Sequence, residues 1–369
     1  MNLKSCFGSK YPSNALNIAV GFDNVHKIVK FCRVRKLDFS ACEVREYPYT
    51  QQFLSEEFLL EFKDICAKYI AEFPSSQQLA CYLMLPDSMI AMDNVTLPQM
   101  KRDKLNHALN TELSKLYKNH KELQFKHYII SSDKQCVTFL LTIVKKHNLA
   151  ELYRVLAENK FYAKGTTYQA NCLVGGVLHL KSAYRKKSFL FLDIHSDYTN
   201  IAVCAKGRTA GFATLMLGAD HLSDAELLQE HMLYNHDFAN LAVINAQEKA
   251  RMKALTVADE LETPRRILKL EHRQEPVDSE GFIYENFRMF LKWALLYERE
   301  LKGQAFMPKL DCVLVNMPKK YSFVIDKVNA EKESGLPFEY LGDFGEKITE
   351  NLDVIGALYC GVYNKSQNF

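Results

Sequence analysis

The order of apolar segments repeats within the chain, and this repeat constrains the fold more than any other feature. Near residue 17, and again near residue 188, alternating apolar runs predict three strands, a helix, a strand and a further helix. In each copy a short polar turn joins the first two strands, as in a β-hairpin. Such a hairpin-led unit differs from the alternating βαβ order of doubly wound dinucleotide folds. We therefore predict an α/β protein of two similar lobes with a cleft between them.

The periodicity also gives approximate boundaries for the two lobes. The first lobe is predicted over residues 15–185, with strands at 17–22, 26–31, 41–47 and 78–85 and a helix at 55–72. The second is predicted over 186–363, with strands at 188–194, 199–205, 209–217, 310–315 and 338–341 and helices at 220–234, 280–301, 321–333 and 351–363.

A different unit, at about residues 86–146, is predicted as an α+β subdomain inserted into the first lobe. The capping-box pattern that starts at Thr96, with Pro98 near the first turn, predicts a helix from there to about Lys118. Two strands follow at 125–131 and 137–144, and Asn148 is then expected to cap a helix that ends near Asn159. The pair Gly175–Gly176, in an apolar segment, is interpreted as allowing close helix packing rather than phosphate binding.

Composition excludes several classes of protein. The net charge of +3 is small and the basic residues are scattered, so no nucleic-acid footprint is predicted. None of the ten cysteines forms a CxxC pair, and His231 and His236 are spaced poorly for one helix face, so no metal site is predicted. No Walker loop, Gly-x-Ser-x-Gly motif or paired-carboxylate pattern indicates a catalytic residue.

The chain also lacks the sequence signals of secretion or membrane insertion. No apolar segment follows Met1 as in a signal peptide, and the longest apolar runs, such as 137–144, are about eight residues. A helix that spans a bilayer needs roughly 20 apolar residues. We therefore expect a cytoplasmic protein that inserts into no membrane directly.

Four short strings carry a family resemblance. They are residues 148–159 followed by Phe161 and Tyr162, the turn 191–199, the segment 215–222 and the segment 356–361. In their order and spacing they resemble the superfamily of actin, heat-shock chaperone ATPases and sugar kinases. Within it the chain is similar to the PilM-like family of type IV pilus and type II secretion assembly proteins, with the cell-division protein FtsA as a more distant relative. The resemblance spans about 17 to 363 and implies a two-lobed actin-like (ribonuclease H-like) fold.

The resemblance also implies where a nucleotide site would lie. Actin-like ATPases hold phosphates between two hairpin turns, and each turn needs glycine so that backbone N–H groups can approach the oxygens. The first turn has Gly21, but Ala19 stands where the family has an aspartate; Asp23 either replaces that aspartate or serves only to form the turn. The second turn keeps Asp193 and Thr199, but His195 stands where glycine belongs. Its imidazole either crowds a phosphate or hydrogen-bonds one.

A third glycine position, after the strand at 310–315, reads Met317-Pro318 here, and proline removes a backbone donor. We therefore interpret Gly21, Asp23, Asp193, His195 and Thr199 as vestigial nucleotide-site positions. Hydrolysis is not expected, and no cofactor is predicted, with ATP and magnesium as the alternative.

The function implied by the resemblance is that of a non-catalytic adaptor. PilM-like proteins bind a short cytoplasmic peptide of the inner-membrane protein PilN near the inserted subdomain, so this chain is expected at the inner membrane through such a partner. Whether it forms a homo-oligomer stays open. The alternative is an ATP-dependent small-molecule kinase of the same superfamily. An FtsA-like division protein would need a C-terminal amphipathic helix, which the last residues lack.

Overall fold

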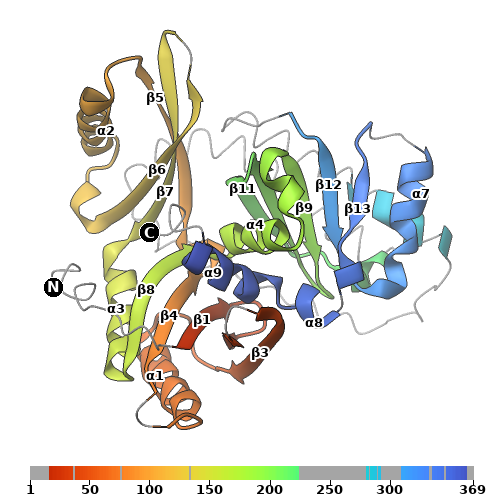
Figure 1. Cartoon of the computed structure of the whole chain (residues 1–369), viewed down its shortest axis with the longest axis horizontal. Helices are drawn as coiled ribbons and strands as arrows, with labels where there is room; N and C mark the ends of the chain where they lie inside the picture. Colours follow the sequence, from red (N-terminus) through yellow and green to blue (C-terminus); the bar gives the residue numbers. More distant parts are fainter. Residues whose placement is uncertain are drawn as a thin grey trace.

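The computed structural model describes residues 16–35, 38–74, 77–132, 134–223, 280–281, 283–288, 290–291, 309–331, 335–344 and 346–363. Two five-stranded sheets dominate this part of the chain, and a third, three-stranded sheet projects from the first (Figure 1). The predicted helix at 220–234 falls almost wholly outside the described residues, as do His231 and His236. The described part of the predicted helix at 280–301, residues 280–291 without 282 and 289, is helical.

The first sheet has the strand order β3-β2-β1-β4-β8. Its strands are β1 (Leu16–Asp23), β2 (Ile28–Arg35), β3 (Asp38–Pro48), β4 (Leu79–Leu85) and β8 (Phe161–Tyr168). The hairpin strands β1, β2 and β3 pair antiparallel, whereas β1, β4 and β8 pair parallel.

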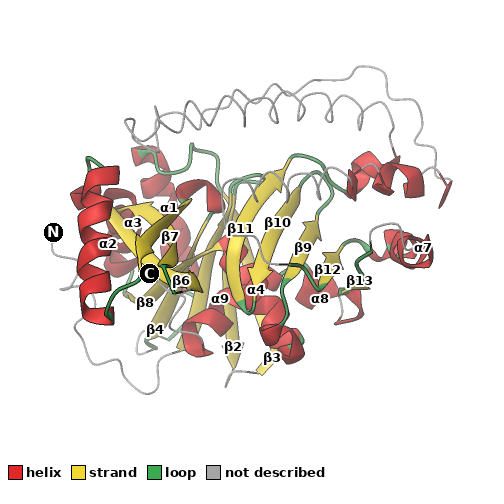
Figure 2. Cartoon of the chain, turned by 90° about the horizontal axis from the view of Figure 1, so that it is seen from above, coloured by secondary structure: helices red, strands yellow, loops and turns green. Residues whose placement is uncertain are grey.

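The second sheet repeats this plan strand for strand. Its order is β11-β10-β9-β12-β13, which Figure 2 shows from one edge to the other. Its strands are β9 (Phe189–Ile194), β10 (Thr199–Ala205), β11 (Arg208–Leu215), β12 (Cys312–Asn316) and β13 (Phe338–Tyr340). Here too the three hairpin strands are antiparallel and the remaining pairs are parallel. The repeat predicted from the sequence is therefore present in three dimensions.

Helix α1 (Glu56–Ile70) shows how the sequence builds one covered face of the first sheet. Ser55 caps the helix, because its side chain accepts a hydrogen bond from the backbone N–H of Phe58 at 3.1 Å. Phe58 and Phe62 are spaced by one helical turn, and both pack against Phe22 of β1. Helix α3 (Lys146–Glu158) packs beside α1. The expected cap at Asn148 is wrong, because the helix begins two residues earlier and Asn148 lies in its first turn.

Two helices lie between the sheets, and each packs on the sheet of the other lobe. Helix α4 (Gln169–Leu180) follows the first lobe but reaches β10 and β11, whereas α9 (Leu352–Tyr363), near the end of the chain, packs on β1, β4 and β8 (Figure 1). A Cβ atom on Gly356 would lie 1.8 Å from the carbonyl oxygen of Cys172, so the helices touch through glycine. Gly175 and Gly176 likewise face Cys360 and Leu352, which confirms close helix packing as their role.

The inserted subdomain is a three-stranded antiparallel sheet with one helix on it. Its order is β5-β7-β6, formed by β5 (Ala91–Pro98), β6 (Leu123–Ser132) and β7 (Cys136–Lys145), and its helix is α2 (Arg102–Leu116). The capping box predicted at Thr96 is wrong. Thr96 instead bonds Thr138 across the sheet at 3.0 Å, and Pro98 ends β5, an edge strand where a missing N–H is tolerated.

The remaining elements complete the second lobe. They are the short helix α8 (Glu346–Thr349), which leads into α9, and helix α7 (Phe323–Glu331), which packs against β13. In the part of the chain that the structure describes, no helix is both long enough and apolar enough to cross a bilayer.

Candidate functional site

Asp23 closes the first hairpin, at the end of β1. One carboxylate oxygen, Oδ1, accepts hydrogen bonds from the backbone N–H groups of Val25 and His26, each at 3.0 Å. The other, Oδ2, lies 2.9 Å from Nδ1 of His26. Burial opposes ionisation of Asp23, but the hydrogen bonds of His26 and the charge of Lys30 hold its pKa below the ordinary value. Of the two roles open for Asp23, the geometry matches the turn-forming one.

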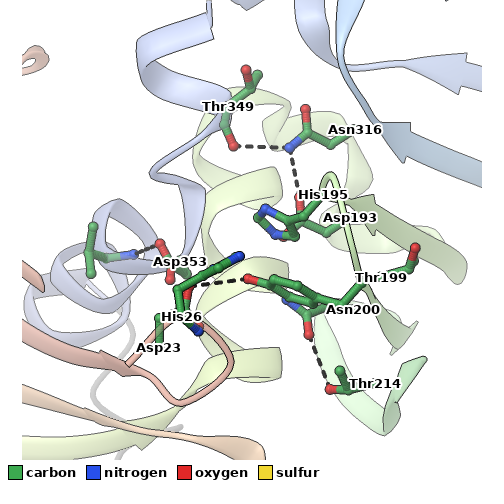
Figure 3. A network of polar contacts seen from close by, with 12 residues as sticks. Asp23, His26, Asp193, His195, Thr199, Asn200, Thr214, Asn316, Thr349 and Asp353 are labelled. Atoms are coloured by element: carbon green, nitrogen blue, oxygen red, sulfur yellow. Dashed lines mark hydrogen bonds and ion pairs between the residues drawn. The ribbon is translucent and has the colours of Figure 1, made fainter. Parts of the chain in front are cut away.

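The second turn, between β9 and β10, is organised around Asp193 and His195 (Figure 3). Nε2 of His195 lies 2.9 Å from Oδ2 of Asp193, and the amide of Asn316 donates to Oδ1 of Asp193 at 2.7 Å. Asp193 is buried, which disfavours its charged form, but the nearby His195 and the bond from Asn316 lower its pKa. Burial likewise disfavours charge on His195, yet the charge of Asp193 raises its pKa. The imidazole therefore belongs to an ion pair inside its own lobe.

The two turns touch one another across the space between the lobes. The hydroxyl of Tyr198 donates to Oδ2 of Asp23 at 3.5 Å, and Nε2 of His26 lies 3.2 Å from Oδ1 of Asp197. The ring of Tyr198 also stacks on His195, with centroids 4.4 Å apart, and lies 5.5 Å from the ring of His26. Three rings and two carboxylates thus lie where the two hairpin turns meet.

The chain itself also covers the second turn. The backbone N–H of Ala219 donates to the carbonyl of His195 at 2.7 Å, and that of Asp220 donates to Ser196 at 2.9 Å. This approach requires Gly218, because a Cβ atom there would lie 2.5 Å from the carbonyl oxygen of His195. Thr199 fixes the same segment, since its hydroxyl donates to the carbonyl of Leu217 at 2.6 Å.

Lys30 of β2 supplies the positive charge of the site. Lys30 is only 8% exposed, and its pKa is raised because the charges of Asp353, Asp23, Glu46 and Asp193 together outweigh the effect of burial. Its ammonium group lies 3.9 Å from the carboxylate of Glu46. Asp353, in the first turn of α9, is itself buried. An ammonium group therefore balances carboxylates from both lobes.

The structure brings four of the five predicted positions together and separates the fifth. Asp23, Asp193, His195 and Thr199 lie at the two turns (Figure 3). Gly21 instead lies within β1, where a Cβ atom would meet the side chains of Met84 and Val354, so its role is to admit α9. The third predicted position, Met317-Pro318, follows β12, where the carbonyl of Met317 accepts a hydrogen bond from Tyr340 at 3.2 Å.

Sequence reasoning missed six residues of this site: His26, Lys30, Asp197, Tyr198, Asn316 and Asp353. A signal existed for Lys30, because it interrupts an apolar strand between Val29 and Phe31. Asn316 carried a weaker signal, as a polar residue at the end of a buried strand.

The chemistry of the site is that of paired charges rather than of a metal centre. Within the described residues, no group of three or more histidine, cysteine, aspartate or glutamate side chains is placed to hold a metal ion. Both oxygens of Asp23 and both oxygens of Asp193 already have hydrogen-bonding partners.

Comparison with known proteins places the chain by its fold. No family model matches the sequence, and no curated protein matches it. A solved structure of the PilM-PilN type IV pilus biogenesis complex is similar, with a TM-score of 0.51 and 12% identity over 96% of this chain and 98% of that chain. The predicted two-lobed actin-like α/β fold is thereby confirmed.

Two further structures are more distant. One is the cytoplasmic domain of EpsL, an inner-membrane component of the type II secretion system of Vibrio cholerae, with a TM-score of 0.34 and 13% identity over 57% of this chain and 74% of that one. The other is the apo pSK41 ParM protein, with a TM-score of 0.42 and 10% identity over 96% and 99% of the two chains.

Proposed function

We propose that this chain is a non-catalytic actin-like adaptor of a type IV pilus or type II secretion machine. In this role it binds the short cytoplasmic tail of a PilN-like inner-membrane protein and stays at the membrane through that partner. The observation that carries the proposal is the contact between the hairpin turns, where Tyr198 meets Asp23. The likeness in fold to a protein solved in a PilM-PilN complex supplies the class of partner.

The contacts between the turns support the non-catalytic part of the proposal. Phosphate oxygens need backbone N–H groups and open space at this position. Here the stacked rings of His195 and Tyr198 stand in that space, and the backbone N–H of His195 already donates to the carbonyl of Tyr198 at 2.9 Å. Lys30 already balances the carboxylates, which is the task a magnesium ion performs beside bound phosphates.

The inserted subdomain supplies a surface for the partner peptide. Strand β6 is an edge of its sheet, and an edge strand offers unpaired backbone groups to an extended peptide. Ile129, on this strand, is 50% exposed although it is a large apolar residue. We therefore place the docking surface on the 86–146 subdomain, centred on β6.

Calorimetry with two ligands tests the proposal. The first is a synthetic peptide with the cytoplasmic sequence of the membrane protein encoded beside this chain, and the second is ATP with Mg²⁺. We expect binding of the peptide and no binding of ATP at millimolar concentration. Magnesium-dependent ATP binding, or transfer of phosphate to a small molecule, would favour the kinase alternative. Failure of the peptide to bind would remove the adaptor role.

A further inference from the structure

Two loops meet at the end of the second sheet that lies opposite the β9–β10 turn. The segment 182–187 leads into β9, and the turn at 206–207 joins β10 to β11. They touch at Gly207, where a Cβ atom would lie 3.0 Å from the carbonyl oxygen of Arg185. The six residues of β9 separate this end from the β9–β10 turn, a distance of about 20 Å. The two loops therefore form a surface distinct from the site between the lobes.

This surface, which we call the basic patch, carries five basic residues: Arg185, Lys186, Lys187, Lys206 and Arg208. Four of them are exposed, and Lys187 is half-buried. The whole chain has a net charge of +3, so the residues outside the patch together carry a net charge of −2. Positive charge is thus concentrated at this end of the second lobe.

Aromatic rings, rather than carboxylates, position these cations. Cζ of Arg208 lies 5.2 Å from the centroid of the Tyr128 ring, and Nζ of Lys187 lies 4.5 Å from the centroid of the Tyr184 ring. Among the residues that the structure describes, none of the five cations forms an ion pair with a carboxylate. Their charge is therefore available to a ligand from outside the chain.

The acidic groups beside the patch have partners of their own. Glu339 pairs with Lys181 at 3.0 Å, and Asp311 accepts a hydrogen bond from the backbone N–H of Ser188 at 2.8 Å. A cluster of exposed cations that the chain does not neutralise attracts anions. The patch therefore favours an anionic partner.

We propose that the basic patch adsorbs to an anionic phospholipid surface, without insertion, and so gives this chain a contact with the bilayer that no partner protein supplies. Clusters of Lys and Arg attract anionic lipids, and each such residue contributes about fivefold to binding. A single-stranded nucleic acid would need open rings on which its bases stack, whereas Tyr184 and Tyr359, which lie under Lys187 and Arg185, are buried.

The position of the patch agrees with this assignment. Tyr128, which lies under Arg208, belongs to β6, so the patch adjoins the proposed docking surface. The cytoplasmic tail of a membrane protein approaches from the bilayer, so the two surfaces can be used together. The lipid contact itself does not depend on the identity of that protein.

Co-sedimentation of the full chain with vesicles measures this contact. One set of vesicles contains phosphatidylcholine alone, and the other is an equal mixture of phosphatidylcholine and the anionic phosphatidylglycerol. We expect binding to the anionic vesicles only. Binding should fall at least about tenfold when the ionic strength rises from about 0.1 M to about 0.5 M, because exposed charges are screened. Equal binding to both compositions, or binding to neither, would overturn the proposal.

Charge reversal of two lysines tests the location of the contact. Lys186→Glu combined with Lys206→Glu should weaken binding to the anionic vesicles at least about 25-fold, since each lost cation contributes about fivefold. The matched control, Lys68→Glu combined with Lys104→Glu, makes the same change in net charge at exposed positions of α1 and α2 and should weaken binding less than about threefold.

Two outcomes of the variant experiment would contradict the assignment. Equal losses in the two double variants would mean that net charge, rather than the basic patch, governs adsorption. Tighter binding to an RNA oligonucleotide than to the anionic vesicles, lost in the patch variant alone, would make the surface a nucleic-acid site. Urea denaturation shows that both double variants are folded before they are compared.

Discussion

The hydroxyl of Tyr198, which follows the second hairpin turn, lies 3.5 Å from Oδ2 of Asp23, which precedes the first. In an ATPase of this fold the phosphates of the nucleotide lie between these turns. Here side chains from both lobes meet in the same place, and His26 and Asp197 add a second contact beside the first. The two lobes of the chain thus contact one another directly at these turns.

Replacement of His195 by glutamine should lower the free energy of unfolding by about 1–3 kcal/mol, because the buried carboxylate of Asp193 loses its charged partner. The folded-state pKa of His195 is raised, so its contribution is complete below the ordinary histidine value of about 6.5 and is lost as the pH rises through the raised value. The pKa of Asp193 is lowered, so its contribution is lost only as the pH falls through that lowered value.

Urea denaturation at several pH values checks this prediction. The difference between wild type and variant should be largest between about pH 4 and about pH 6.5 and should shrink at alkaline pH. His147→Gln, which changes an exposed histidine on α3, is the control and should show no such profile. A difference that grows with pH would contradict the charged pair.

Replacement of Lys30 by methionine should destabilise the protein by about 3 kcal/mol or more. The variant removes the buried cation whose charge stabilises the nearby carboxylate of Asp353, and it breaks the 3.9 Å ion pair with Glu46; loss of a buried charge partner is costly. Thermal and urea denaturation give the change in the free energy of unfolding. Lys63→Met, which breaks a half-exposed pair with Glu158, should cost at most about 1 kcal/mol. Equal effects of both variants would mean that Lys30 balances no buried charge.

Alanine at Gly356 should destabilise the protein by about 1–3 kcal/mol, since its Cβ atom would lie 1.8 Å from the carbonyl oxygen of Cys172. The contact lies between α4 and α9, the helices that join the lobes. Gly281→Ala is the control, because nothing lies within 4 Å of a Cβ atom there and the residue is helical. The control should be neutral or stabilising by up to about 1 kcal/mol. Tolerance of alanine at Gly356 would show that the helices can separate without loss of stability.

The substitution Asp87→Asn should stabilise the protein near neutral pH. Asp87 is buried and accepts a hydrogen bond from the backbone N–H of Ala170 at the start of α4, and burial raises its pKa to about 7. Because the folded state holds the proton more tightly than the unfolded state, the wild type loses stability as the pH rises from about 4 to about 7. Asparagine keeps the acceptor and avoids this loss, so the gain at pH 7 should be roughly 2–4 kcal/mol. If the free energy of unfolding of the variant, measured by urea denaturation, depended on pH as that of the wild type does, the raised pKa of Asp87 would be contradicted.

The docking surface can be tested by a single charge on β6. Ile129→Asp should weaken binding of the partner peptide at least about fivefold in calorimetry, because an apolar contact is replaced by a charge. Leu60→Asp is the matched control, since Leu60 is a large apolar residue on α1 that is 66% exposed. Equal losses in the two variants would point to a general effect of charge rather than to a surface on the subdomain.

The repeated fold was predictable because it depends on local patterns. Alternation of apolar residues predicted the hairpin strands of both lobes, and Ser55 with Phe58 and Phe62 predicted α1. The predicted start of the helix at Thr96 was wrong, although the helix is present as α2, because a capping box and a strand end share the same residue types. Only pairing with β7, which sequence spacing does not reveal, decides between them.

The candidate site was predictable only in part. His195 was expected either to crowd a phosphate or to hydrogen-bond one, and its pairing with Asp193, formed in the turn just after β9, was not foreseen. The electrostatic influence of Asp353 on Lys30, and the contact of Tyr198 with Asp23, join residues more than a hundred positions apart. Such proximity arises from the placement of the lobes, which no local pattern encodes.

Because α9 belongs to the second half of the chain but packs on the first sheet, the order of synthesis affects how the first lobe folds. Helix α9 covers a face of the first sheet, yet its residues, Leu352–Tyr363, follow every other described element along the chain and are therefore synthesised after them. Until α9 is made, the face of β1 that carries Gly21 is uncovered, because Val354 of α9 packs over it and neighbouring strands pair only with the edges of β1. The first lobe therefore cannot complete its core until α9 has been synthesised. Truncation before residue 352 should leave an aggregation-prone intermediate rather than an independent lobe.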